Sequence, residues 1–375
     1  AAAAPFATDW RADPTPARWH ATFWRSWHGL LHACEPSLDR IGSIDSSGPT
    51  HVVLGPGSVR LFCRVLEPTS PVRATLLTTH GYSGVDDLSG AAQTWRSLGD
   101  RGVQIVQMAV RGFPPSDADT GDLRNPDTGG WISRGLVASP DKPAELLDWS
   151  YPLALADMAC VARAAIAHAD GAPLMLHGES FGGGHEQISG PLYAIALPLV
   201  GLATLLAAGF SRRGYLGRIG LAVALAGLLP GVVTRLVIGL PTMGDWPWRL
   251  EHRAGGGLGA EVDRFIIDHA RLSIDHERSI AQTLRLADSV VHARHVACPT
   301  LCKLALRDDV VPAPTAAAIY NALGPAASRR ARWKRGAFGA PPPSSVRALT
   351  GPGRKPPARR ARLRVGGGEG LHVAD

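Results

Sequence analysis

The chain of 375 residues is 45% hydrophobic and 19% charged, a composition that supports a full buried core and excludes a fibrous or wholly disordered protein. Its formal net charge of +7 is unevenly distributed, because residues 326–375 hold 12 basic and 2 acidic side chains, which leaves 27 basic and 30 acidic ones before them. The body is therefore close to neutral, and we expect no specific nucleic-acid partner.

The cysteines and the N-terminus indicate the kind of protein. There are five cysteines, an odd number without paired metal-type spacing, so we expect reduced buried thiols, no metal site and no cofactor. Residues 1–10 lack the basic stretch and apolar run that are typical of a secretory signal. We therefore expect a cytoplasmic protein.

The predicted elements alternate between helix and strand along the chain. Residues 1–50 are rich in tryptophan and are expected to form a helical N-terminal wrap that covers a sheet. Apolar runs predict strands at 51–54, 58–66, 74–79, 103–109, 174–177, 235–240 and 299–306, and helices at 91–98 and 154–168. This alternation predicts one α/β domain over residues 51–325, with a mostly parallel sheet covered by helices on both faces.

Two segments depart from the alternation. Residues 188–210 and 219–234 carry no charge, so residues 188–234 are interpreted as an apolar insertion or lid, with membrane attachment as the alternative. Residues 326–375 are rich in Gly, Pro, Ala and Arg and have almost no apolar periodicity. That composition is typical of a disordered basic tail.

A short apolar run ends in Gly178-Glu179-Ser180-Phe181-Gly182, a Gly-x-Ser-x-Gly pattern. Small residues are needed there because a tight turn from strand to helix lifts the serine hydroxyl clear of the sheet. The pattern predicts that Ser180 is a catalytic nucleophile, and a helix N-cap is the structural alternative.

The partners of such a serine are sought at the ends of other strands. Thr79-His80-Gly81-Tyr82 ends one apolar run, and we expect the backbone amides of Tyr82 and Phe181 to form an oxyanion hole. Asp308 and Asp309 follow the run at 299–306, where a carboxylate is well placed to orient a histidine. Spacing alone does not choose between these two aspartates.

Several stretches resemble the acetyl xylan esterase and cephalosporin C deacetylase family, carbohydrate esterase family seven. The stretches are Thr79 to Gly84, Val110-Arg111-Gly112, Trp131 to Leu136, Gly178 to Gly182, Asp275 to Arg278, Cys298 to Leu301, and Asp308 to Asn321. The similarity covers roughly residues 20–185 and 235–325. It implies an α/β-hydrolase fold, a carboxylic ester hydrolase that deacetylates carbohydrates, a homo-oligomer, and Asp308 as the acid, counted back from Tyr320-Asn321.

The chain departs from the family pattern at three places. Phe113 and Phe181 stand where the family has glutamine, and Ala340 falls about where the family has its catalytic histidine. No histidine occurs between His295 and His372, so His372 is the one candidate base that follows Asp308 in the sequence. His177 and His185 flank the serine in sequence and are expected to be structural.

These observations predict a serine esterase that removes acetyl groups from acetylated sugars or related small esters through an acyl-serine intermediate. The predicted catalytic residues are Ser180, Asp308 and His372, and the predicted partner is a small acetylated sugar or ester. Because the expected histidine is absent, activity is predicted to be impaired. The alternatives are a catalytically inactive hydrolase-fold protein that acts by binding, and an esterase attached to a membrane through residues 188–234.

Overall fold

The computed structural model of the chain describes most of the predicted core. The described residues are 12–13, 20–32, 34, 36–42, 50–80, 96–116, 120, 130–136, 145–179, 219–239, 241–253, 258–270, 274–305, 311–324, 329–334, 363–366 and 370–373.

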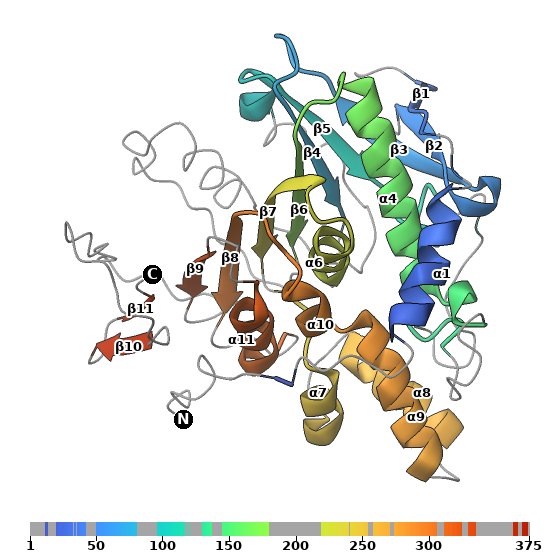
Figure 1. Cartoon of the computed structure of the whole chain (residues 1–375), viewed down its shortest axis with the longest axis vertical. Coiled ribbons are helices and arrows are strands. Elements are labelled where there is room, and N and C mark those ends of the chain that lie inside the picture. The colour runs from blue at the N-terminus through green and yellow to red at the C-terminus, as the bar shows by residue number, and fades with distance from the viewer. Residues whose placement is uncertain are drawn as a thin grey trace.

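Within the described residues, nine strands form one sheet in the order β1-β2-β3-β5-β4-β6-β7-β8-β9 (Figure 1). The strands are β1 (Asp39–Arg40), β2 (His51–Leu54), β3 (Arg60–Leu66), β4 (Ala74–Thr79), β5 (Val103–Met108), β6 (Leu174–Glu179), β7 (Val233–Gly239), β8 (Thr300–Ala305) and β9 (Arg329–Lys334). The pairs from β1 to β3 and the pair β3 with β5 are antiparallel, and every later pair is parallel. A second sheet contains only β10 (Leu363–Gly366) and β11 (Gly370–Val373), which pair antiparallel.

The central strands are apolar on both faces because the parallel part of the sheet is buried on both sides. Alternate residues of a strand point to opposite faces. Leu77 of β4 and Val106 of β5 belong to the main hydrophobic core, whereas their neighbours Leu76 and Ile105 belong to a smaller cluster. Leu98, from the helical turn at 96–99, packs in that smaller cluster.

Helices cover the main core. They are α1 (His20–His32), α4 (Ser150–His168), α6 (Ile219–Leu228), α7 (Trp246–His252), α8 (Leu258–Ala270), α9 (Ile274–Leu284), α10 (Ser289–Ala293) and α11 (Ala313–Ala322), with short 3-10 turns η2 (Pro56–Ser58), η3 (Glu145–Asp148) and η5 (Arg285–Ala287). In Figure 1, α1 lies beside α4, α6 lies against β6 and β7, and α8 and α9 stack together at one end of the molecule. Trp27 of α1 is fully buried, and its indole Nε1 donates to the Pro152 carbonyl of α4 at 2.7 Å.

Most strands predicted from apolar runs are confirmed to within two residues, and the helix predicted at 154–168 is confirmed as α4, which begins four residues earlier. The earlier start fits Pro152, because proline is tolerated in the first turn of a helix, where backbone N–H groups have no intrahelical acceptor. The pattern did not specify the helices between 240 and 299, where the structure has α7 to α10.

The second charge-free run contains a core helix. Side chains 221–226 of α6 are all buried, and α6 contacts β6, β7 and α10. A ten-residue helix is too short to cross a bilayer, so these residues form part of the globular core. Residues 188–218 lie outside the described part of the chain. By length and composition, α4 is the one described helix that could span a membrane, but most of it is buried in the same core.

The sheet extends beyond the boundary at residue 325 that composition predicted. Arg329–Lys334 form β9, and these residues pair with β8 in parallel from Thr300 to Ala305. Composition did not predict this strand because its basic sequence lacks apolar periodicity, and its backbone is ordered by the hydrogen-bond ladder to β8.

Candidate active site

The ends of the parallel strands gather at one edge of the sheet. Register places Thr79 of β4 opposite Met108 of β5, and Glu179 of β6 opposite Gly239 of β7. Ligand and catalytic sites of parallel sheets lie at this carboxyl edge. The strands β4 and β6, which precede the predicted oxyanion segment and Ser180 in the sequence, therefore end at the same edge.

Ser180 follows directly after the last residue of β6, and Asp308 comes three residues after the end of β8. Tyr82 follows β4 by three residues, and Phe181 follows Ser180. Ser180, Phe181, Tyr82 and Asp308 all lie outside the described residues, so their mutual distances stay a prediction.

The predicted base lies in the two-stranded sheet, whereas the strands that precede the other candidates in the sequence belong to the nine-stranded sheet. His372 is in β11, opposite Arg364 of β10, and β11 lies near β9. By contrast, His177 lies in β6 and is buried, with its Nδ1 3.0 Å from the Thr78 hydroxyl. Burial lowers the pKa of His177 to about 3, so its imidazole is neutral at pH 7. Its expected structural role is confirmed, and His185 lies outside the described residues.

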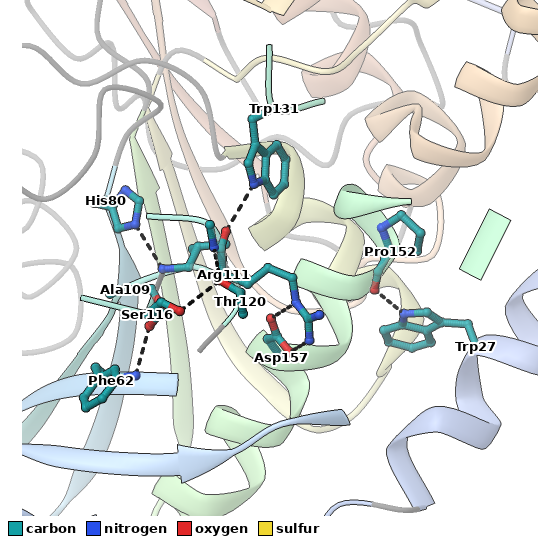
Figure 2. A network of polar contacts seen from close by, with 12 residues as sticks. Trp27, Phe62, His80, Ala109, Arg111, Ser116, Thr120, Trp131, Pro152 and Asp157 are labelled. Atoms are coloured by element: carbon teal, nitrogen blue, oxygen red, sulfur yellow. Dashed lines mark hydrogen bonds and ion pairs between the residues drawn. The ribbon is translucent and has the colours of Figure 1, made fainter. Parts of the chain in front are cut away.

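His80 joins the ends of two strands beside the predicted oxyanion segment. Its side chain is buried, and its Nε2 accepts a hydrogen bond from the backbone N–H of Val110 at 3.0 Å (Figure 2). Because the backbone amide can only donate, Nε2 is unprotonated and Nδ1 carries the ring proton. The Phe113 ring packs against His80 with 5.1 Å between centroids. His80 therefore fixes the start of the segment that continues to Tyr82.

The loop after β5 is held by a buried ion pair. Arg111 Nε and its terminal Nη2 each donate to one carboxylate oxygen of Asp157, both at 2.6 Å (Figure 2). Asp157 lies in α4 with a fully buried side chain. Two parallel charge-assisted hydrogen bonds fix both distance and orientation. The Trp131 indole also donates to the Arg111 carbonyl, at 3.1 Å.

Two hydroxyl groups bond to further backbone groups of that loop. The Ser116 hydroxyl donates to the Ala109 carbonyl at 2.7 Å and accepts from the Phe62 amide at 3.0 Å. The Gly112 amide donates to the Thr120 hydroxyl at 2.8 Å. Buried backbone groups need such partners, so this short loop has one well-defined path.

A second segment, residues 130–136, is hydrogen-bonded to both α4 and α8. The Ser133 amide donates to Glu261 of α8 at 2.6 Å, and the Ser150 hydroxyl of α4 donates to the Trp131 carbonyl at 2.6 Å. The Trp149 indole donates to the Ile132 carbonyl. This segment carries the Trp131 to Leu136 stretch that resembles the esterase family.

Sequence reasoning missed Asp157 and Glu261, the carboxylates that hold these two segments. A signal existed for Asp157, which is the one acidic residue in the apolar sequence of α4. A carboxylate in a buried helix requires a cation or several donors. Glu261 lies in an amphipathic helix where acidic residues are ordinary, and it gave no such signal.

The strand order, with antiparallel first pairs followed by parallel strands and a serine directly after β6, defines an α/β-hydrolase fold. Two solved structures share it, an acetyl xylan esterase from Paenibacillus sp. R4 and acetyl xylan esterase 1 from Thermoanaerobacterium sp. JW/SL YS485. The first has a TM-score of 0.66 at 18% identity, and the alignment covers 89% of this chain and 94% of the Paenibacillus chain. The second has a TM-score of 0.64 at 17% identity and covers 90% of this chain and 93% of its own.

At this level of identity the likeness shows the fold, and it confirms the fold that the sequence resemblance implied. No protein-family model matches the sequence, and no curated protein matches it significantly.

Proposed function

We propose that the chain is a serine esterase that removes acetyl groups from acetylated sugars or related small esters. One observation carries the proposal: Ser180, in a Gly-x-Ser-x-Gly sequence, directly follows β6 in an α/β-hydrolase sheet. In this fold a serine at that turn is the exposed nucleophile. The similarity to two acetyl xylan esterases supports the choice of an acetyl ester as substrate.

The proposed reaction passes through an acetyl-serine. The Ser180 oxygen attacks the ester carbonyl carbon while a histidine takes the hydroxyl proton, and the amides of Tyr82 and Phe181 stabilise the oxyanion. The carbon–oxygen bond to the sugar then breaks, and the histidine returns the proton to the departing alcohol. Water attacks the acetyl-serine by the same steps and releases acetate. Asp308 orients the histidine, and His372 is the candidate for this catalytic histidine.

The described residues support the proposal by holding the loops around this edge. His80 ties the oxyanion segment to the end of β5, and Arg111 ties the next loop to α4 through Asp157. Phe113, which replaces the family's glutamine, presents an aromatic ring beside His80 and Trp131. We infer that this change alters contacts to the substrate more than it alters the hydrolytic machinery.

A fluorophosphonate probe tests the nucleophile without requiring turnover at a high rate. We expect covalent labelling of the full chain, loss of labelling and of p-nitrophenyl acetate hydrolysis in Ser180→Ala, and an unchanged circular dichroism spectrum. Ser26→Ala is the matched control, because Ser26 is an exposed residue of α1. Retained hydrolysis in Ser180→Ala would refute the assignment. An unlabelled parent chain would favour an inactive hydrolase-fold protein that acts by binding.

A further inference from the structure

Three side chains with metal-binding atoms meet away from the predicted catalytic edge. His51 begins β2, Glu67 follows the last residue of β3, and His168 ends α4. Their ligand atoms all lie within 4.8 Å of one another. Leu66 is opposite Ile105, near the start of β5, so the cluster lies at the edge where the parallel strands begin. β6, which precedes Ser180 in the sequence, ends at the other edge.

The spacing suits a small divalent cation. Zinc binds histidine nitrogen and carboxylate oxygen at about 2.0–2.2 Å, so neighbouring ligand atoms of a tetrahedral site lie about 3.3–3.6 Å apart. His168 Nε2 and Glu67 Oε1 are 3.0 Å apart. Both side chains are partly exposed, which gives an ion a path from solvent, and the His168 ring can rotate to shorten the longer separations.

His51 is buried and held in one orientation. Its Nδ1 is 2.9 Å from the Thr50 hydroxyl, which also accepts the Val65 amide at 2.8 Å. With Nδ1 engaged, Nε2 is the ring nitrogen available to a metal. Hydrogen bonding of the second ring nitrogen is characteristic of histidine ligands.

Glu67 is held in the same manner. The buried Gln104 amide donates to Glu67 Oε2 at 3.1 Å and to Oε1 at 3.3 Å, and the Gln104 carbonyl oxygen accepts from the Thr75 hydroxyl at 3.3 Å. Carboxylate ligands are oriented by outer-shell hydrogen bonds of this type. The residues that orient Glu67 therefore come from β4 and β5, while the three ligands come from β2, the end of β3 and α4.

We propose that His51, Glu67 and His168 form a divalent metal site, of the two-imidazole and one-carboxylate type that suits Zn²⁺, with water at the remaining position. Such a set matches the ligand preferences of zinc. A bound ion links the N-terminal strand pair to the end of α4, and it stabilises the folded chain because the unfolded chain lacks the assembled site. Local spacing did not predict this site because the ligands are far apart in sequence.

The test uses the full chain, treated with EDTA, dialysed and titrated with ZnCl2 by isothermal calorimetry at pH 7.5. We expect one equivalent of Zn²⁺ to bind and to raise the Tm. His168→Ala and Glu67→Gln should each weaken binding at least about 10-fold, since loss of even an outer-shell partner commonly costs that much. The matched control is His276→Ala, because His276 is an exposed histidine of α9 that does not belong to the proposed ligand set.

Two results would overturn the proposal. One is the absence of both a binding heat and a Tm shift in the parent chain. The other is unchanged Zn²⁺ affinity in His168→Ala and Glu67→Gln, which would place the bound ion on other histidines or cysteines. Both variants change partly exposed side chains, so they are expected to fold, whereas the buried His51 is kept intact.

Discussion

Arg111 and Asp157 illustrate how single residues shape the predicted site. Both side chains are almost completely removed from solvent, and their two hydrogen bonds join the loop after β5 to α4. Taking two charges out of water is costly, and their attraction offsets that cost only when the geometry is good. The pair therefore contributes mainly by specifying one position for the loop.

Breaking this pair should cost far more than replacing it. Asp157→Leu and Arg111→Met should each lower the free energy of unfolding by about 3–5 kcal/mol, because each leaves a buried charged partner unsatisfied. The double variant Arg111→Met with Asp157→Leu should cost clearly less than the sum of its single variants. Urea unfolding of the parent, the two single variants and the double variant completes a double-mutant cycle. Additive losses of unfolding free energy would show that the two residues act independently.

A buried histidine makes stability depend on pH. His292 of α10 is buried, and its Nε2 donates to the Leu286 carbonyl at 2.9 Å. Burial lowers the pKa of His292 to about 3. In the unfolded chain the histidine has a pKa of about 6.5, so between about pH 6.5 and pH 3 it binds a proton that His292 in the folded chain does not bind.

The contribution of His292 to the free energy of unfolding is therefore fully present above about pH 6.5 and is lost as the pH falls toward the pKa of the folded state. His292 alone should contribute a slope of up to about 1.4 kcal/mol per pH unit between pH 6 and pH 4. In His292→Gln, whose amide can still donate to the carbonyl, the loss of stability on acidification should be shallower. Urea unfolding at pH 7, 6 and 5 tests this, and parallel profiles for the two proteins would contradict it.

At the scale of elements, the segment 130–136 depends on a glycine where it passes the start of α4. Gly135 has φ of +77°, and a Cβ added there would lie 2.6 Å from the Asp148 carbonyl oxygen. Glycine is needed for both reasons, since other residues are strained at positive φ and the neighbouring atom is backbone. Beside this close approach, the Ser150 hydroxyl of α4 donates to the Trp131 carbonyl.

Gly135→Ala should lower the free energy of unfolding by about 2–5 kcal/mol, the sum of backbone strain and overpacking. Gly171→Ala is a matched control, because Gly171 has φ of +81° with nothing within 4 Å of an added Cβ. It should cost only about 1–2 kcal/mol. Equal losses in thermal or urea unfolding would show that the contact with Asp148 contributes little.

At the scale of the whole molecule, the parallel strands β4, β6 and β8, which precede the predicted oxyanion segment, nucleophile and acid in the sequence, end at one edge of the sheet. The last parallel strand, β9, ends at Lys334, and the family resemblance expects the catalytic histidine in the turn that follows. Residues 335–362 contain no histidine, and His372 lies beyond them in β11. Serine without a positioned base is a poor nucleophile at neutral pH.

A chain whose residues after Lys334 are replaced by a turn carrying Gly-His-Glu should therefore hydrolyse p-nitrophenyl acetate faster than the parent, by about 10²–10⁴-fold. The matched control carries Gly-Ala-Glu in the same graft and should stay at or below the parent rate. His372→Ala in the parent chain completes the set. If that change removes most of a substantial activity, His372 is the base and the predicted impairment is wrong.

The local sequence by itself determined the strands around the predicted site and the position of its serine. Apolar runs act over a few neighbours, so β4, β5 and β6 could be recognised without any distant contact, and the Gly-x-Ser-x-Gly sequence at the end of β6 is likewise a local pattern. The same locality explains why Asp308 could be chosen over Asp309 only through the family resemblance.

Only the tertiary structure decided which distant residues became partners. Arg111 meets Asp157, and His51 meets Glu67 and His168, because strand order and the packing of α4 bring together segments that no local pattern connects. Tertiary contacts also made α6 a core helix and extended the sheet to β9. Burial and long-range pairing supply the free energy in these cases, and neither is visible in local periodicity.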